Sequence, residues 1–254
     1  MRFTVLGSGT TVPDADRGPA GFLLQRDGAQ VLIDGGGGTI QRLARAGVDA
    51  RDLDGGVYSH RHVDHCGELV PLLFTLRVGA DKPRQRDYPI WAGEGFAAFL
   101  AQLKAVYPGW LEGRQWSPRV TELPLNGPGE APLPGGLTLR TLPANHAAGA
   151  LHLRFESPEG GSLVFSGDTG PSQNLITLTR GADVLVTECA VEPNDPYGGH
   201  LCAEDIVQVV REARPKRVLL THFYPGVNVA RALALIAAEG VDVRRAEDGD
   251  VVEV

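Results

Sequence analysis

The run Ser59-His60-Arg61-His62-Val63-Asp64-His65 limits the possible folds of this chain more than any other segment. The residues before it, Gly55 to Ser59, predict a strand that ends on the first histidine. Because side chains two positions apart in an extended chain leave on the same face, His60 and His62 are predicted to point the same way. Asp64 and His65 follow where the chain turns into a helix. Three imidazoles and a carboxylate within six residues are a suitable ligand set for a borderline divalent metal. We therefore favour a metal site over a solvent-exposed polar loop.

Three other predicted strands also end on a potential ligand. The strand over 137–142 leads to His146, the strand over 162–165 leads to Asp168, and the strand over 217–220 leads to His222. Taken alone, each would be an ordinary polar residue at the end of a strand. Together with the first run, they predict a site for two metal ions, with the ligands His60, His62, Asp64, His65, His146, Asp168 and His222.

A pair of metal ions predicts hydrolytic chemistry. Two divalent ions roughly 3.5–4 Å apart share a water molecule and lower its pKa toward neutrality, which provides a hydroxide nucleophile. The same ions stabilise the negative charge that develops on an attacked phosphoryl or carbonyl group. Imidazole dominates the ligand set, so zinc is the expected ion, with manganese and iron as alternatives.

Composition excludes several other classes of protein. The net charge of -7 argues against electrostatic capture of long nucleic acid. The three cysteines, Cys66, Cys189 and Cys202, have no paired spacing that indicates disulfides. Cys66 follows His65, and we expect it to be a buried thiol rather than a ligand. No apolar run approaches the roughly 20 residues that span a bilayer, so we expect a soluble, cytoplasmic protein without a membrane partner.

Outside the site, the hydrophobic pattern predicts strands in two groups, each followed by helices. Helices are predicted over 39–46, 68–78, 96–106, 203–213 and 229–239, and strands over 3–6, 21–25, 31–33, 55–59, 88–91, 137–142, 150–155, 162–165, 184–186 and 217–220. Residues 107–135 are rich in Pro and Gly and are predicted to be irregular. The pattern favours two packed sheets with helices outside them, in one domain over 1–254.

With these motifs assembled, the sequence resembles the metallo-β-lactamase superfamily, and within it the ribonuclease Z-like phosphodiesterases. The resemblance covers nearly the whole chain, and it rests on Gly7-Ser8-Gly9-Thr10, Leu32-Ile33-Asp34, the run from His60 to His65, His146, Ser166-Gly167-Asp168-Thr169 and Thr221-His222-Phe223. It implies an α+β fold, a four-layer αβ/βα sandwich of two mixed β-sheets flanked by helices, with the metals at one edge. It also implies a division of the ligands: His60, His62 and His146 on one metal, Asp64, His65 and His222 on the other, and Asp168 bridging both.

The resemblance further implies catalytic residues. His200 corresponds to a histidine that points into the site without binding metal and serves as general acid or electrostatic stabiliser. A helix-capping or surface histidine is the alternative. Glu188 is placed to accept a hydrogen bond from His200, although a lone carboxylate at a strand end is as often structural. Asp64 is expected to serve catalysis as well as metal binding.

Two more residues carry expectations about their surroundings. Asp34 is expected either to orient a ligand histidine or to cap the helix that follows the glycines. His152 alternates with Leu151 and Leu153 in a predicted strand, so it is expected to face away from them and to lie at the surface.

The length of the segment between His146 and Asp168 limits the class of substrate that we expect. Ribonuclease Z enzymes that process transfer RNA carry a long protruding arm, and in several of them it lies between the positions matching His146 and Asp168. Here only the 21 residues 147–167 separate those positions, and two predicted strands with the turn between them take up residues 150–165. We therefore expect a small-molecule or short nucleotide phosphodiester as substrate rather than long RNA. A homodimer is left open.

Two other hypotheses stand beside the phosphodiesterase. The same ions could hydrolyse a lactone, thioester or β-lactam, with His200, Tyr197 or Tyr224 polarising the carbonyl group. A non-hydrolytic metal-binding or redox relative is the third hypothesis. The full ligand set argues against an inactive site, and the lack of a flavin partner domain argues against electron transfer.

Overall fold

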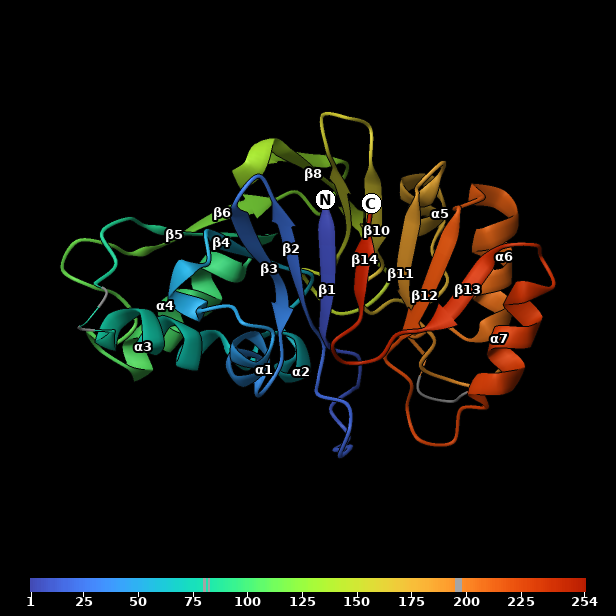
Figure 1. The fold of residues 1–254 in the computed structure, drawn as a ribbon, viewed down its shortest axis with the longest axis horizontal. Coiled ribbons are helices and arrows are strands. Elements are labelled where there is room, and N and C mark those ends of the chain that lie inside the picture. The colour runs from blue at the N-terminus through green and yellow to red at the C-terminus, as the bar shows by residue number, and fades with distance from the viewer. Residues whose placement is uncertain (80, 82, 195–197) are drawn as a thin grey trace.

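The computed structural model describes residues 1–79, 81, 83–194 and 198–254, and these form two β-sheets packed against each other (Figure 1). The first sheet has the order β14 (Val251–Glu253), β1 (Arg2–Gly7), β2 (Gly21–Arg26), β3 (Ala29–Gly35), β4 (Gly55–Tyr58), β5 (Tyr88–Gly93) and β6 (Pro118–Leu123). The second has the order β13 (Asp242–Arg245), β12 (Arg217–Thr221), β11 (Val184–Glu188), β10 (Ser162–Phe165), β9 (Leu151–Glu156), β8 (Leu137–Pro143) and β7 (Gly129–Leu133).

Both sheets are mixed, and they are mixed in the same way. In the first, β1, β2 and β3 pair antiparallel, whereas β3 to β6 pair parallel. In the second, β8, β9 and β10 pair antiparallel, whereas β10 to β13 pair parallel. Parallel strands have their carboxyl ends at one edge of the sheet, so the loops that follow them gather there.

Helices cover the outer face of each sheet (Figure 1). The first sheet carries α1 (Thr39–Arg45), α3 (Leu69–Val78) and α4 (Phe96–Val106), and the second carries α5 (Gln173–Thr179), α6 (Ala203–Ala213) and α7 (Val229–Ala237). Short turns complete the elements: α2 (Val63–Cys66) and the 3₁₀ turns η1 (Ala50–Asp52) and η2 (Pro134–Gly136). The predicted four-layer sandwich is confirmed. None of the helices in the described residues is long and apolar enough to cross a bilayer.

The core between the sheets follows from alternation along the inner strands. Phe3 in β1 and Phe165 in β10 point inward, whereas Val164 in β10 packs outward against the helices. The ring of Phe22 stacks on Phe3 with centroids 5.3 Å apart and meets Phe165 edge-on at 5.0 Å. Because these strands are buried on both faces, they are almost continuously apolar in sequence.

Residues 107–135, predicted to be irregular, contain two strands, β6 and β7. That prediction was wrong because both strands lie at sheet edges. An edge strand tolerates proline, since its outer amide groups need no partner in the sheet. Pro118 and Pro132 therefore lie inside strands, although in the sequence they favour loops.

His152, predicted to lie at the surface, is fully buried. The prediction was wrong because α5 packs on β8 and β9 and covers the outer face of this part of the sheet. The Nδ1 atom of His152 lies 2.7 Å from the carbonyl oxygen of Ser166, and its Nε2 atom lies 3.0 Å from the hydroxyl of Ser172, the N-cap of α5. Burial lowers the pKa of His152 to about 4.

The lowered pKa of His152 predicts a loss of stability in acid. The unfolded chain binds a proton on this ring near pH 6.5, but the folded chain does so only near pH 4, so between these values the free energy of unfolding falls as pH falls. Wild type should therefore lose about 2 kcal/mol more than His152→Asn when pH is lowered from 7.5 to 5. Urea unfolding of both proteins at the two pH values measures this difference. Parallel pH curves would show that His152 titrates normally.

Candidate metal centre

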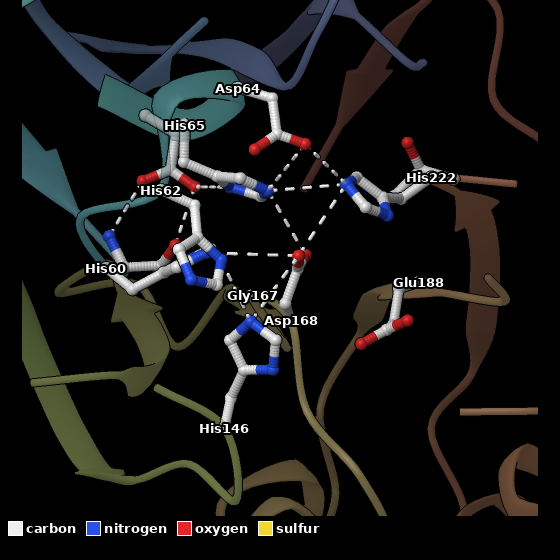
Figure 2. A network of polar contacts seen from close by, with 12 residues as sticks. His60, His62, Asp64, His65, His146, Gly167, Asp168, Glu188 and His222 are labelled. Atoms are coloured by element: carbon white, nitrogen blue, oxygen red, sulfur yellow. Dashed lines mark hydrogen bonds and ion pairs between the residues drawn. The ribbon is translucent and has the colours of Figure 1, made fainter. Parts of the chain in front are cut away.

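The seven predicted ligands lie together at the edge where the loops of the two sheets meet (Figure 2). They come from five loops or turns: His60 and His62 follow β4, Asp64 and His65 lie in α2, and His146, Asp168 and His222 follow β8, β10 and β12. Strand ends from both halves of the chain therefore supply one cluster, as the sequence pattern predicted for this edge.

Asp168 occupies the centre of the cluster (Figure 2). Its carboxylate oxygens lie 3.2 Å from Nε2 of His65 and 3.6 Å from Nε2 of His222. They lie 3.8 Å from Nε2 of His60 and 3.9 Å from Nε2 of His146. One carboxylate thus faces four imidazoles from separate loops, which is the placement that a bridging ligand needs.

The donor atoms fall into groups small enough to hold an ion. One group joins His60, His62, His146 and Asp168, and a second joins Asp64, His65 and His222, with the ligand atoms of each group within 4.8 Å of one another. A third group of the same size joins Asp168, His200 and His222. Within the second group, Nε2 of His222 lies 3.3 Å from a carboxylate oxygen of Asp64.

Asp34 fixes the orientation of a histidine in this cluster. Its carboxylate lies 2.7 Å from Nδ1 of His65 and accepts hydrogen bonds from both the amide and the hydroxyl of Ser59, each at 2.7 Å. The Ser59 hydroxyl also lies 3.0 Å from Nδ1 of His60. Both histidines are therefore held through Nδ1, which leaves Nε2 facing the site. The sequence analysis named Ser59 as the first residue of this run but did not predict its contacts with Asp34 and His60.

The alternative expectation for Asp34, a cap for the following helix, was wrong. The N-cap of α1 is Gly38, and its amide donates to the carboxylate of Glu68 at 2.8 Å. One of the glycines before this helix, Gly36, is required by a close approach instead. A Cβ atom on Gly36 would lie 2.3 Å from the carbonyl oxygen of Asp64, so only glycine lets this turn pack against α2.

His222 is held by the loop after β1. Its backbone adopts φ 57°, a left-handed conformation that is costly for a residue other than glycine. Its amide donates to the carbonyl oxygen of Ser8 at 2.9 Å, and the hydroxyl of Thr221 donates to the same oxygen. Asp248 in turn accepts hydrogen bonds from the amide and the hydroxyl of Ser8. These contacts join the two ends of the chain beneath one predicted ligand.

The loops that carry His146 and Asp168 are tied to each other. The amide of Asn145 donates to the hydroxyl of Thr169 at 3.1 Å, and the amide of Gly170 donates to the carbonyl oxygen of Asn145 at 2.9 Å. Nδ1 of His146 lies 2.9 Å from the carbonyl oxygen of Gly199, so this ring also presents Nε2 to the site.

His200 and Glu188 lie beside the cluster and contact each other. Nδ1 of His200 lies 2.9 Å from a carboxylate oxygen of Glu188, and the other oxygen accepts a hydrogen bond from the amide of Thr169. Burial raises the pKa of Glu188 to about 7. Burial alone would lower the pKa of His200, but the hydrogen bond and charge of Glu188 outweigh it and the pKa is raised. The ring of His200 lies 5.1 Å from that of His146 between centroids.

The chemistry of the donor set fits metal cations. Burial and the neighbouring imidazole of His65 hold the pKa of His60 well below its usual range, which favours the neutral form that binds metal. Nε2 of His60 is buried without a hydrogen-bond partner among the described residues, although buried polar atoms are normally satisfied. The carboxylates of Asp168 and Asp34 raise the pKa of His65 against the effect of burial, and a site that attracts a proton in this way also attracts a cation.

Cys66 is a buried thiol, as predicted. Its sulfur lies 3.3 Å from the carbonyl oxygen of Arg61, and burial raises its pKa to about 12. A protonated thiol is a poor metal ligand.

Comparison with known proteins agrees with this geometry. The model of the Beta-lactamase superfamily domain matches residues 29–223. A ribonuclease Z from Mycobacterium bovis is 36% identical over 196 residues, which is 73% of this chain and 69% of that protein. The residues matched by the family model include the loops after β4, β8, β10 and β12.

Solved structures share the fold. The metallo-β-lactamase fold protein YhfI from Bacillus subtilis superimposes with a TM-score of 0.84 at 22% identity, covering 99% of this chain and 98% of that one. The short form of human tRNase Z superimposes with a TM-score of 0.81 at 20% identity, covering 100% and 99%. On the family match and the shared sequence, the chain belongs to the metallo-β-lactamase superfamily of metal-dependent hydrolases, as a ribonuclease Z-like member.

Proposed function

We propose that the chain is a metal-dependent phosphodiesterase that acts on small or short nucleotide phosphodiesters. The observation that carries this proposal is the His200–Glu188 pair beside the cluster. A phosphodiester leaving group is an alkoxide, and its departure is assisted by a proton donor held next to the reacting phosphorus. The raised pKa of His200 favours its protonated form, and among the described residues no hydrogen bond engages its Nε2, which is proposed as the donor.

The metal ligands divide as the family resemblance implies. His60, His62 and His146 would hold one ion, Asp64, His65 and His222 the other, and Asp168 would bridge them, in accord with the groups of donor atoms in the structure. Two divalent ions bound here supply an activated water and positive charge beside the scissile group. Five imidazoles among seven ligands favour zinc, with manganese and iron as alternatives.

The chain's own residues then have distinct tasks. Asp34 and Ser59 hold His65 and His60 with Nε2 toward the site. Asp64 both completes a ligand group and, 3.3 Å from His222, places a carboxylate where it can accept a proton from the attacking water. Glu188 keeps His200 charged and in place for proton donation.

A short substrate is supported by the connection between His146 and Asp168. β9, β10 and the turn between them span residues 151–165 of it, so there is no room in residues 147–167 for a long RNA-binding arm. The similar protein from Mycobacterium bovis is named a ribonuclease, which supports cleavage of phosphodiester bonds. The net charge of -7 does not favour binding of long RNA.

A carbonyl hydrolase is the second candidate function, because one tyrosine lies next to the site. The ring of Tyr224 lies 5.6 Å from that of His200 and 5.6 Å from that of His222, measured between centroids. A phenol in that place could polarise a lactone or thioester carbonyl. Tyr197, the other tyrosine considered for this role, lies outside the described residues.

Turnover of bis(p-nitrophenyl) phosphate tests the proposed function. Protein freed of metal with a chelator is reloaded separately with zinc and with manganese, and release of p-nitrophenolate is measured. We expect turnover that depends on the added metal. Protein that holds two metals per chain but releases no p-nitrophenolate, while hydrolysing a lactone or thioester, would support the carbonyl hydrolase instead.

Asp34→Asn is expected to weaken metal binding without abolishing it. The amide cannot hold Nδ1 of His65 as the carboxylate does, and the loss of such a supporting partner typically costs about 10- to 100-fold in metal affinity. Competition with a chromophoric chelator measures the dissociation constant. Asp54→Asn is the control, because Asp54 accepts a hydrogen bond from the amide of Gln30 at the other end of β3. Equal affinity of both variants would contradict the role of Asp34.

A further inference from the structure

A cavity of about 240 Å³ lies next to the metal centre, between the loop after β1 and the loop after β12. Its lining includes Ser8 and Val12 from the first loop and Tyr224 from the second. Tyr224 is shared with the metal centre, since its ring stands nearly perpendicular to those of His200 and His222. The cavity therefore adjoins the His222 side of the site. A second cavity, of about 880 Å³ between β1, β2 and α1, includes none of the predicted site residues.

The walls of the smaller cavity suit a flat, largely apolar group. Val12, Pro13, Phe223 and Pro225 contribute apolar surface, and Tyr224 contributes an aromatic ring. Aromatic rings bind nucleobases by stacking, whatever the base. The volume is below the roughly 300–1,000 Å³ of sites for drug-sized ligands, so it fits one ring system and part of a sugar rather than a whole oligonucleotide.

The charged residues that line the cavity, Asp14, Arg17 and Arg245, take part in ion pairs, but the Nε atoms of Arg17 and Arg245 are buried without a hydrogen-bond partner among the described residues. Arg17 lies 2.7 Å from Glu247 and 3.6 Å from Asp14. Arg245 lies 3.7 Å from Glu247, and its guanidinium stands 5.5 Å above the ring of Phe223. The cavity thus offers apolar surface together with two buried guanidinium N–H donors, whereas the adjoining cluster offers the place for the anionic phosphate.

Hydrogen bonds fix the position of the cavity relative to the metal centre. Ser8 lines it, and the carbonyl oxygen of Ser8 accepts the hydrogen bond from the amide of His222. Asp248 binds the amide of Ser8 at 2.8 Å and the amide of Gly18 at 2.9 Å, which closes the base of the loop. A ligand group in this cavity would therefore keep one position relative to the reacting phosphate, as productive catalysis requires.

We propose that this cavity binds the nucleoside part of a phosphodiester substrate, with Tyr224 as the wall between the nucleoside and the scissile phosphate. The inference rests on the proposed phosphodiesterase function and narrows it to substrates that carry a nucleoside. Tyr224 and the segment around Val12 would set this specificity, and the ligands of the metals would act on any phosphodiester.

Two esters with the same leaving group test the proposal. Thymidine 5′-(p-nitrophenyl) phosphate and methyl p-nitrophenyl phosphate differ only in the nucleoside, and both release p-nitrophenolate. We expect the metal-loaded protein to prefer the thymidine ester by about tenfold or more in kcat/KM, the scale of one stacking contact. Equal kcat/KM for the two esters would overturn the nucleoside subsite and leave the phosphodiesterase standing.

A substitution that fills the cavity tests the same proposal from the side of the protein. Val12 is 38% exposed and lines the cavity, so Val12→Trp places an indole in it from the rim. This variant should lose the preference, so that its kcat/KM for the thymidine ester falls to the value for the methyl ester. Val106→Trp, at an exposed position at the end of α4, is the control and should change neither rate. A preference that survives in Val12→Trp would contradict the proposal.

A binding measurement separates the proposal from turnover. Titration of the metal-loaded protein with thymidine 5′-monophosphate gives a dissociation constant even if neither ester is hydrolysed. We expect Val12→Trp to weaken this binding about tenfold relative to wild type and Val106→Trp to leave it unchanged. Hydrolysis of neither ester would contradict the phosphodiesterase, whereas equal binding by all three proteins would contradict the nucleoside subsite.

Discussion

Asp168→Asn is expected to remove at least one metal ion per chain and to lower hydrolysis of bis(p-nitrophenyl) phosphate by on the order of 10³-fold or more, beyond the about 10- to 100-fold that loss of a supporting partner costs. The carboxylate of Asp168 faces His60, His65, His146 and His222 at 3.2 to 3.9 Å. A neutral amide cannot offset the charge of two cations or offer both oxygens to them. Metal content by elemental analysis and the rate of p-nitrophenolate release measure the two effects.

A second aspartate gives the control for this result. Asp242 is exposed in β13, away from the cluster, and Asp242→Asn removes the same charge from the chain. It should keep full metal content and activity. Thermal unfolding of both variants shows whether the fold survives. A folded Asp168→Asn protein with two metals and a normal rate would refute the bridging role.

His200→Ala is expected to slow hydrolysis by about 10²- to 10⁴-fold when the leaving group is an alkoxide, the usual contribution of a general acid. Dithymidine monophosphate has such a leaving group. A p-nitrophenyl ester should be affected much less, because its phenolate departs readily without a proton. The comparison of the two substrates separates proton donation from simple electrostatic attraction, which would slow both esters alike.

Measuring the metal content shows whether His200 is a metal ligand or a proton donor. Its ring lies in one group of donor atoms with Asp168 and His222, so coordination has to be tested alongside proton donation. Because Nδ1 of His200 is held by Glu188, we expect His200→Ala to retain two metals per chain. Glu188→Gln should show a smaller loss on the alkoxide substrate. Loss of one metal from His200→Ala would make His200 a ligand instead.

Local pattern predicted the fold best where an element is long or fully buried. The helices α4 and α6 and the strand β10 begin and end at the predicted residues. Strands β13 and β14 were not anticipated, because half-exposed strands at or near a sheet edge carry only a weak hydrophobic pattern. The seven-residue helix α5 was also missed, although its N-cap Ser172 is a usual start signal.

In the candidate site, too, some features were predictable from the sequence and others were not. Strand ends indicated His146, Asp168 and His222, because a polar side chain directly after an apolar strand is visible in the sequence. The contacts that hold these residues were not predictable, since they join distant segments. The bond from the amide of His222 to Ser8 spans most of the chain, and His152 is buried only because α5 folds over β9.

The pairing of β14 with β1 bears on how the protein folds during synthesis. The antiparallel ladder joins Phe3 to Val252, so two segments far apart in the sequence pair directly. Until β14 has left the ribosome, β1 has one unpaired edge, which is a template for aggregation. The closing contact also spans nearly the longest separation that the chain offers, and contacts of that kind form slowly. A nascent chain stalled before β14 should therefore depend on chaperones, and deletion of that strand should send the protein into inclusion bodies rather than merely lower its activity.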